Sequence, residues 1–284
     1  MFASIAAAAL SAAAPATIAE HQAACAGKDG WSDPAPPVKI FANVYDVGTC
    51  GIVALLITGP RGHVLLDGAT AEAAPSIAAN IQRLGFKLSD VKLIGNSHEH
   101  LDHAGGIAEL QRLTGATVMA MPGGYVALES GRTDKEDPQF GLHPEFPGSK
   151  VGIMLSDGFV VHQGPLSLTA YATPGHAFGS TSWSWRSCEG KTCATVVYAD
   201  SVSAVSADNY RFSDHKRYVA TFRDSLNKIG RLRCDLLVTP HPGASNLYER
   251  LAGNAALIDR NACKAYADHG RKALNERLAM ERAK

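Results

Sequence analysis

The sequence predicts an α/β fold. Apolar runs typical of β-strands alternate along the chain with segments whose apolar residues recur every three or four positions, as in amphipathic helices. Of the 284 residues, 46% are hydrophobic and 19% are charged, which is the composition of a globular protein and fits one large domain or two small ones. Two pairs of similar segments, described below, indicate in addition that the two halves of the chain share a plan.

Strand and helix signals alternate through the first 121 residues. Apolar runs at 39–48, 51–59 and 63–70 predict a meander of strands, with a Gly-Pro-Arg-Gly turn at 59–62. A helix follows, which Thr70 can cap and Gly85 ends. The next predicted elements are a strand at 91–98, a helix that ends at Gly115 and a strand at 116–121.

The middle of the chain differs from the rest. Residues 122–165 are dense in Gly, Pro and charge and show little periodicity, which predicts a long surface loop, and such loops are usually functional. Beyond it the sequence predicts strands at 166–175, 180–187 and 194–201, a helix through 218–230, a strand at 234–241 and a last helix at 264–282.

Two pairs of segments in the two halves are similar. Residues 63–70 and 195–204 each contain a hydrophobic run followed by an Asp. Residues 91–98 and 234–241 each contain a hydrophobic run followed by a His. Chance similarity or a duplicated unit explains them. A duplication would bring the polar strand ends of both halves to one edge, where open α/β sheets bind their ligands.

The charge balance bears on the partners. The 27 Lys and Arg residues cancel the 27 Asp and Glu residues, and the positive charges form no stripe. Binding to a phosphate backbone or to an anionic membrane requires such a concentration of charge. We therefore expect neither a nucleic acid nor a membrane as a partner.

The N-terminus is predicted to be a signal peptide over residues 1–19. This stretch is small and apolar, Pro15 and the weak hydrophobicity of alanine argue against a membrane span, and residues 17–19 resemble a cleavage site. No Lys or Arg precedes Lys28, which departs from the usual signal, and a disordered tail is the alternative. Export would be to the periplasm or the medium. The proline-rich residues 20–37 are predicted to form an extended N-terminal arm held by Cys25.

Six cysteines in an exported protein indicate disulfides, with 15 possible connectivities. One pair flanks a tight polar turn, and a second joins the start of a predicted strand to the start of the last helix, which leaves a third local pair. The predicted pairs are Cys25 with Cys50, Cys188 with Cys193, and Cys234 with Cys263. A zinc site built from cysteines is the alternative, but the one closely spaced pair has no second pair to complete it.

The most informative segment is the turn between residues 97 and 106, where three histidines and an aspartate occupy six positions. A helix cap needs one such residue, so the cluster indicates metal ligands, and imidazole and carboxylate groups suit Zn²⁺. In an extended loop His98 and His100 project the same way, whereas Asp102 and His103 lie beyond the bend. Because the four candidate ligands point in two directions, they are suited to binding two metal ions. Each ion would still need a further ligand.

Two more histidines follow apolar strands in proline-restricted turns, His176 after Thr-Pro-Gly and His241 after Thr-Pro. We expect them to supply the missing ligands. The remaining histidines have no companion ligand nearby in the sequence and are expected to be structural: His21, His63, His143, His162, His215 and His269.

These motifs resemble the metallo-β-lactamase superfamily, and more specifically the third subclass of class B β-lactamases. The segments that carry the resemblance are DGAT, SHEHLDHAGG, TPGHAFGSTSW, YADSVSA and TPHP, from about residue 38 to the C-terminus. The resemblance implies one domain over 38–284, a four-layer αββα sandwich of two mixed β-sheets with helices on the outer faces. It also implies two Zn²⁺ per chain, one held by His98, His100 and His176 and the other by Asp102, His103 and His241.

The resemblance further implies hydrolysis of the β-lactam amide of penicillins, cephalosporins and carbapenems. Zinc lowers the pKa of bound water to about 7, so a zinc-bound hydroxide would attack the carbonyl, and Asp102 is the candidate catalytic residue that orients it and passes on its proton. We expect a small-molecule substrate and a monomer. The alternatives are another di-zinc hydrolase of this fold, a lactonase or thioesterase, and an exported zinc-binding protein without catalysis.

Several further residues have two interpretations. Many hydrolases of the superfamily carry a metal-bridging Asp after the strand that ends near Ala199, where this subclass has a Ser, and the pair Asp200 and Ser201 leaves open which residue occupies that position. We expect Ser201 to face the metals, and an Asp200 bridge would favour the lactonase or thioesterase. Ser201, Ser203 and Gln139 are candidate donors to the substrate carboxylate. Glu99 is expected behind the ligands or at the surface, and Asp67 is either a partner of a ligand histidine or a turn residue.

Overall fold

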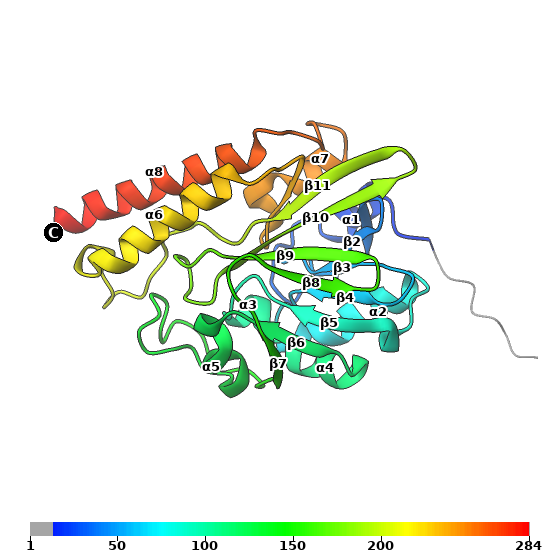
Figure 1. Ribbon diagram of the computed structural model, residues 1–284, viewed down its shortest axis with the longest axis horizontal. Helices are drawn as coiled ribbons and strands as arrows, with labels where there is room; N and C mark the ends of the chain where they lie inside the picture. The colour runs from blue at the N-terminus through cyan, green and yellow to red at the C-terminus, as the bar shows by residue number, and fades with distance from the viewer. Residues whose placement is uncertain (1–13, 284) are drawn as a thin grey trace, which may run out of the picture.

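Two mixed β-sheets pack face to face, and helices cover the outer face of each sheet (Figure 1). The computed structural model describes residues 14–283 of the chain. In the view of Figure 1, α6, α7 and α8 lie at the top and α4 and α5 lie at the bottom, with strands of both sheets between them. The αββα sandwich that the resemblance implied is confirmed.

The first sheet has seven strands, which lie side by side in chain order. The strands up to the fourth pair antiparallel, and those from the fourth to the seventh pair parallel. The run at 39–48, predicted as one strand, is a hairpin, because Ala42 has a positive φ of 50°. The strands are β1 (Val38–Phe41), β2 (Val44–Asp46), β3 (Leu55–Ile57), β4 (His63–Leu66), β5 (Val91–Gly95), β6 (Thr117–Ala120) and β7 (Val151–Met154).

The second sheet has five strands in the order β12-β11-β10-β9-β8. All neighbours pair antiparallel except β11 and β12, which are parallel. The strands are β8 (Phe159–Gln163), β9 (Leu166–Ala172), β10 (Thr181–Glu189), β11 (Thr192–Tyr198) and β12 (Leu236–Val238).

The helices cover the two outer faces and one end of the sandwich. They are α1 (Ile18–Ala24), α2 (Ala74–Arg83), α3 (Leu101–Ala104), α4 (Ile107–Thr114), α5 (Pro122–Ser130), α6 (Lys216–Arg231), α7 (Leu247–Leu251) and α8 (Ala262–Arg282). Short 3₁₀ turns occupy Ala71–Ala73, Leu88–Asp90, Phe212–Asp214 and Pro242–Ser245. Within residues 14–283 we find no helix with the length and apolar character needed to span a membrane.

Three apolar layers hold the four structural layers together. The central layer lies between the sheets and includes Leu55 and Trp183, one from each sheet. A second layer packs the first sheet against α2 and α4, and a third packs the second sheet against α6 and α8. The apolar residues predicted on one face of each helix, such as Ile77 and Phe222, are fully buried in these layers. Burial of this apolar surface is the main term that favours folding.

The similarity between the two halves corresponds to similar structure. β4 and β5 pair in parallel in the first sheet, and β11 and β12 pair in parallel in the second. Each pair ends in an Asp and a His: Asp67 and His98 in the first half, Asp200 and His241 in the second. Because the two pairs open at one edge of the sandwich, the polar strand ends of both halves meet there.

The N-terminal segment is not a fully extended arm. Residues 1–13 of the predicted signal peptide lie outside the described residues, but α1 occupies Ile18–Ala24. Thr17 and Glu20 form a reciprocal capping box, a Thr-x-x-Glu signal that is visible in the sequence. A cleavage after Ala19 would fall within α1 and would remove its N-cap residue Thr17. The prediction of an extended structure over 20–37 is therefore wrong for the first residues of that range.

The segment 122–165 is not one long loop. It contains the strands β7 and β8 and the helix α5. α5 begins at Pro122 and ends at Ser130, and the next residue, Gly131, has the left-handed backbone conformation common after helices. These strands lie at the edges of the two sheets, and alternate residues of β7 are exposed. One-sided burial over so few residues gives a weak apolar pattern, which explains why the sequence did not predict them. The irregular part is residues 131–150.

The six cysteines lie in three close pairs, which are the predicted ones. The Cα–Cα distances are 5.4 Å for Cys25 and Cys50, 4.0 Å for Cys188 and Cys193, and 6.1 Å for Cys234 and Cys263. Cys188 and Cys193 face each other across the β10–β11 hairpin. The pair at 234 and 263 lies where the start of β12 meets the start of α8, at the junction of the second sheet and the last helix.

Candidate metal centre

The predicted ligand residues gather at one edge of the sandwich. His98, His100, Asp102 and His103 come from the segment that joins β5 to α4, His176 from the loop between β9 and β10, and His241 from the turn after β12. All of them except His241 are buried, and the His241 side chain is 39% exposed. The edge therefore holds a cluster of imidazole and carboxylate groups with one side open to solvent.

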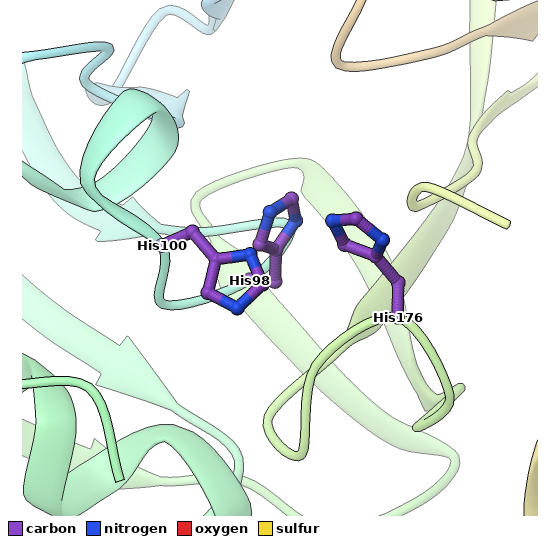
Figure 2. A group of neighbouring side chains, drawn as sticks. All are labelled: His98, His100 and His176. Carbon is purple, nitrogen blue, oxygen red and sulfur yellow. The ribbon is translucent and has the colours of Figure 1, made fainter. Parts of the chain in front are cut away.

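The first three histidines form one group. Their ligand nitrogens lie within 4.8 Å of one another, and Figure 2 shows the rings of His98, His100 and His176 gathered around a common space, two from one loop and one from another. The Nε2 atom of His98 is buried without a hydrogen-bond partner. An unsatisfied buried nitrogen is costly, so its presence indicates that a metal ion completes the group. Three nitrogen donors with an open side fit zinc.

Asp102, His103 and His241 form the second group beside the first. Oδ2 of Asp102 lies 3.1 Å from Nε2 of His103 and 3.3 Å from Nε2 of His241. The two Nε2 atoms lie 3.3 Å apart. His98, Asp102 and His103 also place ligand atoms within 4.8 Å of one another, so the two groups adjoin at His98.

Carboxylates hold the far sides of the buried histidines. Asp200 Oδ1 lies 2.8 Å from Nδ1 of His98, and Asp137 Oδ1 lies 3.0 Å from Nε2 of His100. Such bonds fix the tautomer and orient the free nitrogen of each ring. Asp137 was not predicted as a site residue, because it lies 37 positions from His100 in an irregular segment.

The sequence left open whether Asp200 or Ser201, at the end of β11, faces the metals, and neither interpretation fits the structure as stated. Asp200 is fully buried and contacts His98 on its Nδ1 side, whereas Nε2 points the other way. Asp200 therefore supports a histidine, and the structure does not place it between the two groups. Ser201, which we expected to face the metals, is 8% exposed and lies in the wall of a cavity next to His241.

Asp67 has both of the functions that the sequence left open. Its backbone has a φ of 69°, which marks a sharp turn, and its buried carboxylate contacts Nδ1 of His103 at 3.1 Å. The same carboxylate accepts hydrogen bonds from Ser97 Oγ at 2.6 Å and from the Tyr198 hydroxyl at 2.7 Å, while the Ser97 backbone N–H also donates to it. It thus joins the ends of three strands.

The pKa values of the histidines differ within the cluster. Burial, reinforced by the charge of His100, lowers the pKa of His176 to about 3, and burial lowers that of His98 well below its usual value. Burial would also lower the pKa of His103, but the Asp102 and Asp67 carboxylates outweigh it and raise the pKa to about 10. His103 is therefore the histidine that most favours a proton in the metal-free protein.

The His176 loop is held in place by α6. The Ser225 hydroxyl donates to the carbonyl of Pro174 at 2.7 Å. A Cβ on Gly175 would lie 2.1 Å from the ring of Phe222, so a residue with a side chain at 175 would push the loop off the helix. The Nδ1 atom of His176 lies 3.0 Å from the backbone carbonyl of Ser203, which leaves Nε2 facing the cluster and 3.2 Å from Gln139 Nε2.

The candidate substrate residues lie beside the histidines. Gln139 is buried against His176, Ser203 is exposed, and its hydroxyl lies 3.0 Å from His176 Nδ1. Ser201, Ser203 and His241 line a cavity of about 400 Å³ whose opposite wall is α8. α8 contributes His269 and Arg277 to this wall, two residues that no local motif connects to the site. His269, expected to be structural, therefore lines the same cavity as the proposed ligand His241.

Two further titratable residues lie near the proposed ligands. His143 is half-buried against Trp31, with ring centroids 5.4 Å apart, and burial lowers its pKa despite the opposing charge of Asp102. Of the two places expected for Glu99, behind the ligands or at the surface, the structure shows a buried side chain, and burial raises its pKa to about 7.

Comparison with known proteins agrees with this geometry. The sequence model of the family described as "Metallo-beta-lactamase superfamily" matches residues 47–241. The metallo-beta-lactamase MIM-1 from Novosphingobium pentaromativorans is 48% identical with a TM-score of 0.91, covering 93% of this chain and 98% of that chain. MEM-A1, a subclass B3 metallo-beta-lactamase from a soil metagenome library, is 46% identical with a TM-score of 0.85, covering 89% of this chain and 99% of that chain.

Curated relatives are more distant. An N-acyl homoserine lactonase AttM from Agrobacterium fabrum is 26% identical over 63% of this chain and 74% of its own length. A hydroxyacylglutathione hydrolase from Rhodopseudomonas palustris is 30% identical over 45% of this chain and 44% of its own length. These relatives are hydrolases by name, and the family match spans both halves of the candidate centre from β4 to His241. The chain therefore belongs to the metallo-β-lactamase superfamily and is an enzyme of that fold.

Proposed function

We propose that the protein is a zinc-dependent β-lactamase that hydrolyses the β-lactam amide of penicillins, cephalosporins and carbapenems. The observation that carries the proposal is the convergence of six imidazole and carboxylate ligands beside a cavity with two serine hydroxyls. The similarity to solved metallo-β-lactamases at 46–49% identity over nine-tenths of the chain supports the choice of substrate.

Two zinc ions would occupy the two groups. His98, His100 and His176 would hold one ion, and Asp102, His103 and His241 the other. Bound there, zinc supplies a Lewis acid that polarises a carbonyl oxygen and lowers the pKa of water to about 7.

The remaining steps depend on side chains of this chain. Asp102 Oδ2 faces both His103 and His241, so its other oxygen is the group best placed to orient the attacking water and to accept its proton. We propose that Ser201 and Ser203 donate to the carboxylate that all these substrates carry next to the ring. Gln139 is a third candidate donor, although it already contacts His176. The α8 wall with Arg277 and His269 would contact the rest of the substrate.

A lactonase or thioesterase is the second candidate, because the curated relatives carry those activities in their names. Asp200 bears on the choice. A metal-bridging Asp would favour these reactions, and here its carboxylate contacts the Nδ1 side of His98. Parallel assays with nitrocefin, an acyl homoserine lactone and an S-acyl glutathione decide between the candidates. A higher kcat/KM for the lactone or the thioester would overturn the β-lactamase proposal.

We further propose that the protein is exported to the periplasm or the medium and acts as a monomer. The three close cysteine pairs and the apolar N-terminal stretch support export, because disulfides persist in oxidising compartments.

Zinc dependence is the first test. Chelation should abolish turnover and added zinc should restore it. We expect this because one side of the ligand cluster is open to solvent, so that bound zinc can leave and return. His100→Ala should remove zinc and turnover, whereas His162→Ala, an exposed histidine of β8, should change neither. Active protein without bound transition metal by elemental analysis would contradict the proposal.

Proton release is the second test. Because the pKa of His103 is raised to about 10, this ring is protonated at neutral pH without metal and must lose a proton before its Nε2 binds zinc. The proton lost from His103 should therefore raise zinc affinity by about tenfold per pH unit between pH 7.5 and 9, where histidines of ordinary pKa no longer titrate, in addition to the rise from ionisation of zinc-bound water. Calorimetry in two buffers of different ionisation enthalpy counts the protons. A flat affinity over this range would exclude a protonated His103.

The serines provide the third test. A hydrogen bond to a charged group contributes about 1.5–3 kcal/mol, so Ser201→Ala or Ser203→Ala should lower kcat/KM by roughly ten- to a hundredfold. Zinc content should stay unchanged, since neither serine is a proposed ligand and the backbone carbonyl of residue 203 still contacts Nδ1 of His176 in the alanine variant. A double variant that hydrolyses penicillins and carbapenems as well as the unaltered chain would show that the carboxylate binds elsewhere.

The cysteine pairs are the fourth test. Peptide mapping without reduction should recover Cys25 with Cys50, Cys188 with Cys193, and Cys234 with Cys263. Each native bridge typically contributes about 2–4 kcal/mol to the free energy of unfolding, so reduction should lower the melting temperature. A free thiol in the exported protein, or a cross-pair such as Cys50 with Cys188, would refute the pairing.

A further inference from the structure

Glu99 lies between two proposed ligands in the sequence and binds a different part of the chain. Its side chain is 2% exposed. Both of its carboxylate oxygens accept the backbone N–H of Gly179, at 2.9 and 3.1 Å. Gly179 follows His176 by three residues in the same loop. The carboxylate therefore connects the loop of His98 and His100 to the loop of His176.

The carboxylate fits into a niche between two glycines. A Cβ on Gly179 would lie 2.5 Å from Glu99 Oε2 and 2.4 Å from the Cα of Gly124, which lies in the first turn of α5. A Cβ on Gly124 would lie 3.2 Å from the same oxygen. The niche therefore has no room for other side chains, and the three segments are held at a fixed separation.

Trp183 Nε1 also donates to the Asn96 carbonyl at 3.0 Å, and the other hydrogen bond nearest to the loop runs from the Thr181 N–H to the Ser97 carbonyl at 2.6 Å. This bond lies at the start of β10, beyond the loop itself. Glu99 binds nearer to His176, and its own backbone stands between His98 and His100. A shift of this side chain would therefore change the distance between the nitrogens of the first group directly.

We infer that Glu99 is a positioning residue, whose hydrogen bond to Gly179 sets the separation of His98 and His100 from His176. The inference rests on the proposed assignment of these three histidines as zinc ligands. Groups that orient metal ligands typically contribute ten- to a hundredfold to metal affinity, because the ligand atoms must lie within a few tenths of an ångström of their bonded positions.

The test compares Glu99→Met with Glu99→Gln in the full chain. Methionine has a similar size and no acceptor, whereas the amide oxygen of glutamine still accepts the Gly179 N–H. Competition with a chromophoric chelator should show zinc bound about ten- to a hundredfold more weakly by Glu99→Met, with affinity close to that of the unaltered chain for Glu99→Gln. Glu109→Met, at a half-exposed position of α4, is the matched control and should bind zinc normally.

The outcomes separate this inference from the proposed function. An unaltered chain that binds no zinc would overturn the metal assignment itself. An unaltered chain that binds zinc, with Glu99→Met binding equally well, would overturn the positioning role alone, as would a Glu99→Gln variant as weak as Glu99→Met. If Glu99→Met does not fold, as thermal unfolding would reveal, Glu99→Ala is the second variant without an acceptor, and the same two comparisons apply.

Discussion

The buried carboxylate of Asp67 is the interaction on which the rest of the site depends. It receives the Ser97 backbone N–H and hydroxyl from the end of β5, the ring of His103 from α3, and the Tyr198 hydroxyl from the second sheet. A buried carboxylate is stable only when donors surround it, so the four groups cannot move independently. The two sheets and the histidine segment are thereby fixed to one point.

The same principle repeats around the centre. Asp200 holds His98 from the second half of the chain, and Asp137 holds His100 from the irregular segment 131–150. Each carboxylate occupies one ring nitrogen and leaves the other directed at the common space. The orientation of each ring therefore depends on a carboxylate from another segment of the chain.

The similar arrangement of strands in the two halves explains why the two groups of ligands adjoin. In each half two strands pair in parallel, and an Asp follows the end of the first strand while a His follows the end of the second. The sandwich places both pairs at the same edge, so the support for His98 comes from the half that provides His241. The cavity beside His241 then lies between this edge and α8, whose start lies next to the start of β12 at the close pair Cys234 and Cys263.

The sequence by itself determined the α/β class, most strands and helices, the cysteine pairs and the six candidate ligands, because each of these leaves a local pattern of period, spacing or residue type. It missed β7 and β8, since short edge strands bury one side only and carry little pattern. It also left Asp200 and Ser201 undecided, because a shift of one residue reverses which side chain faces the site. Contacts between segments far apart in the chain place four further residues at the site, namely Asp137, Glu99, His269 and Arg277. Such contacts depend on how sheets and helices pack, and no pattern within a single segment records them.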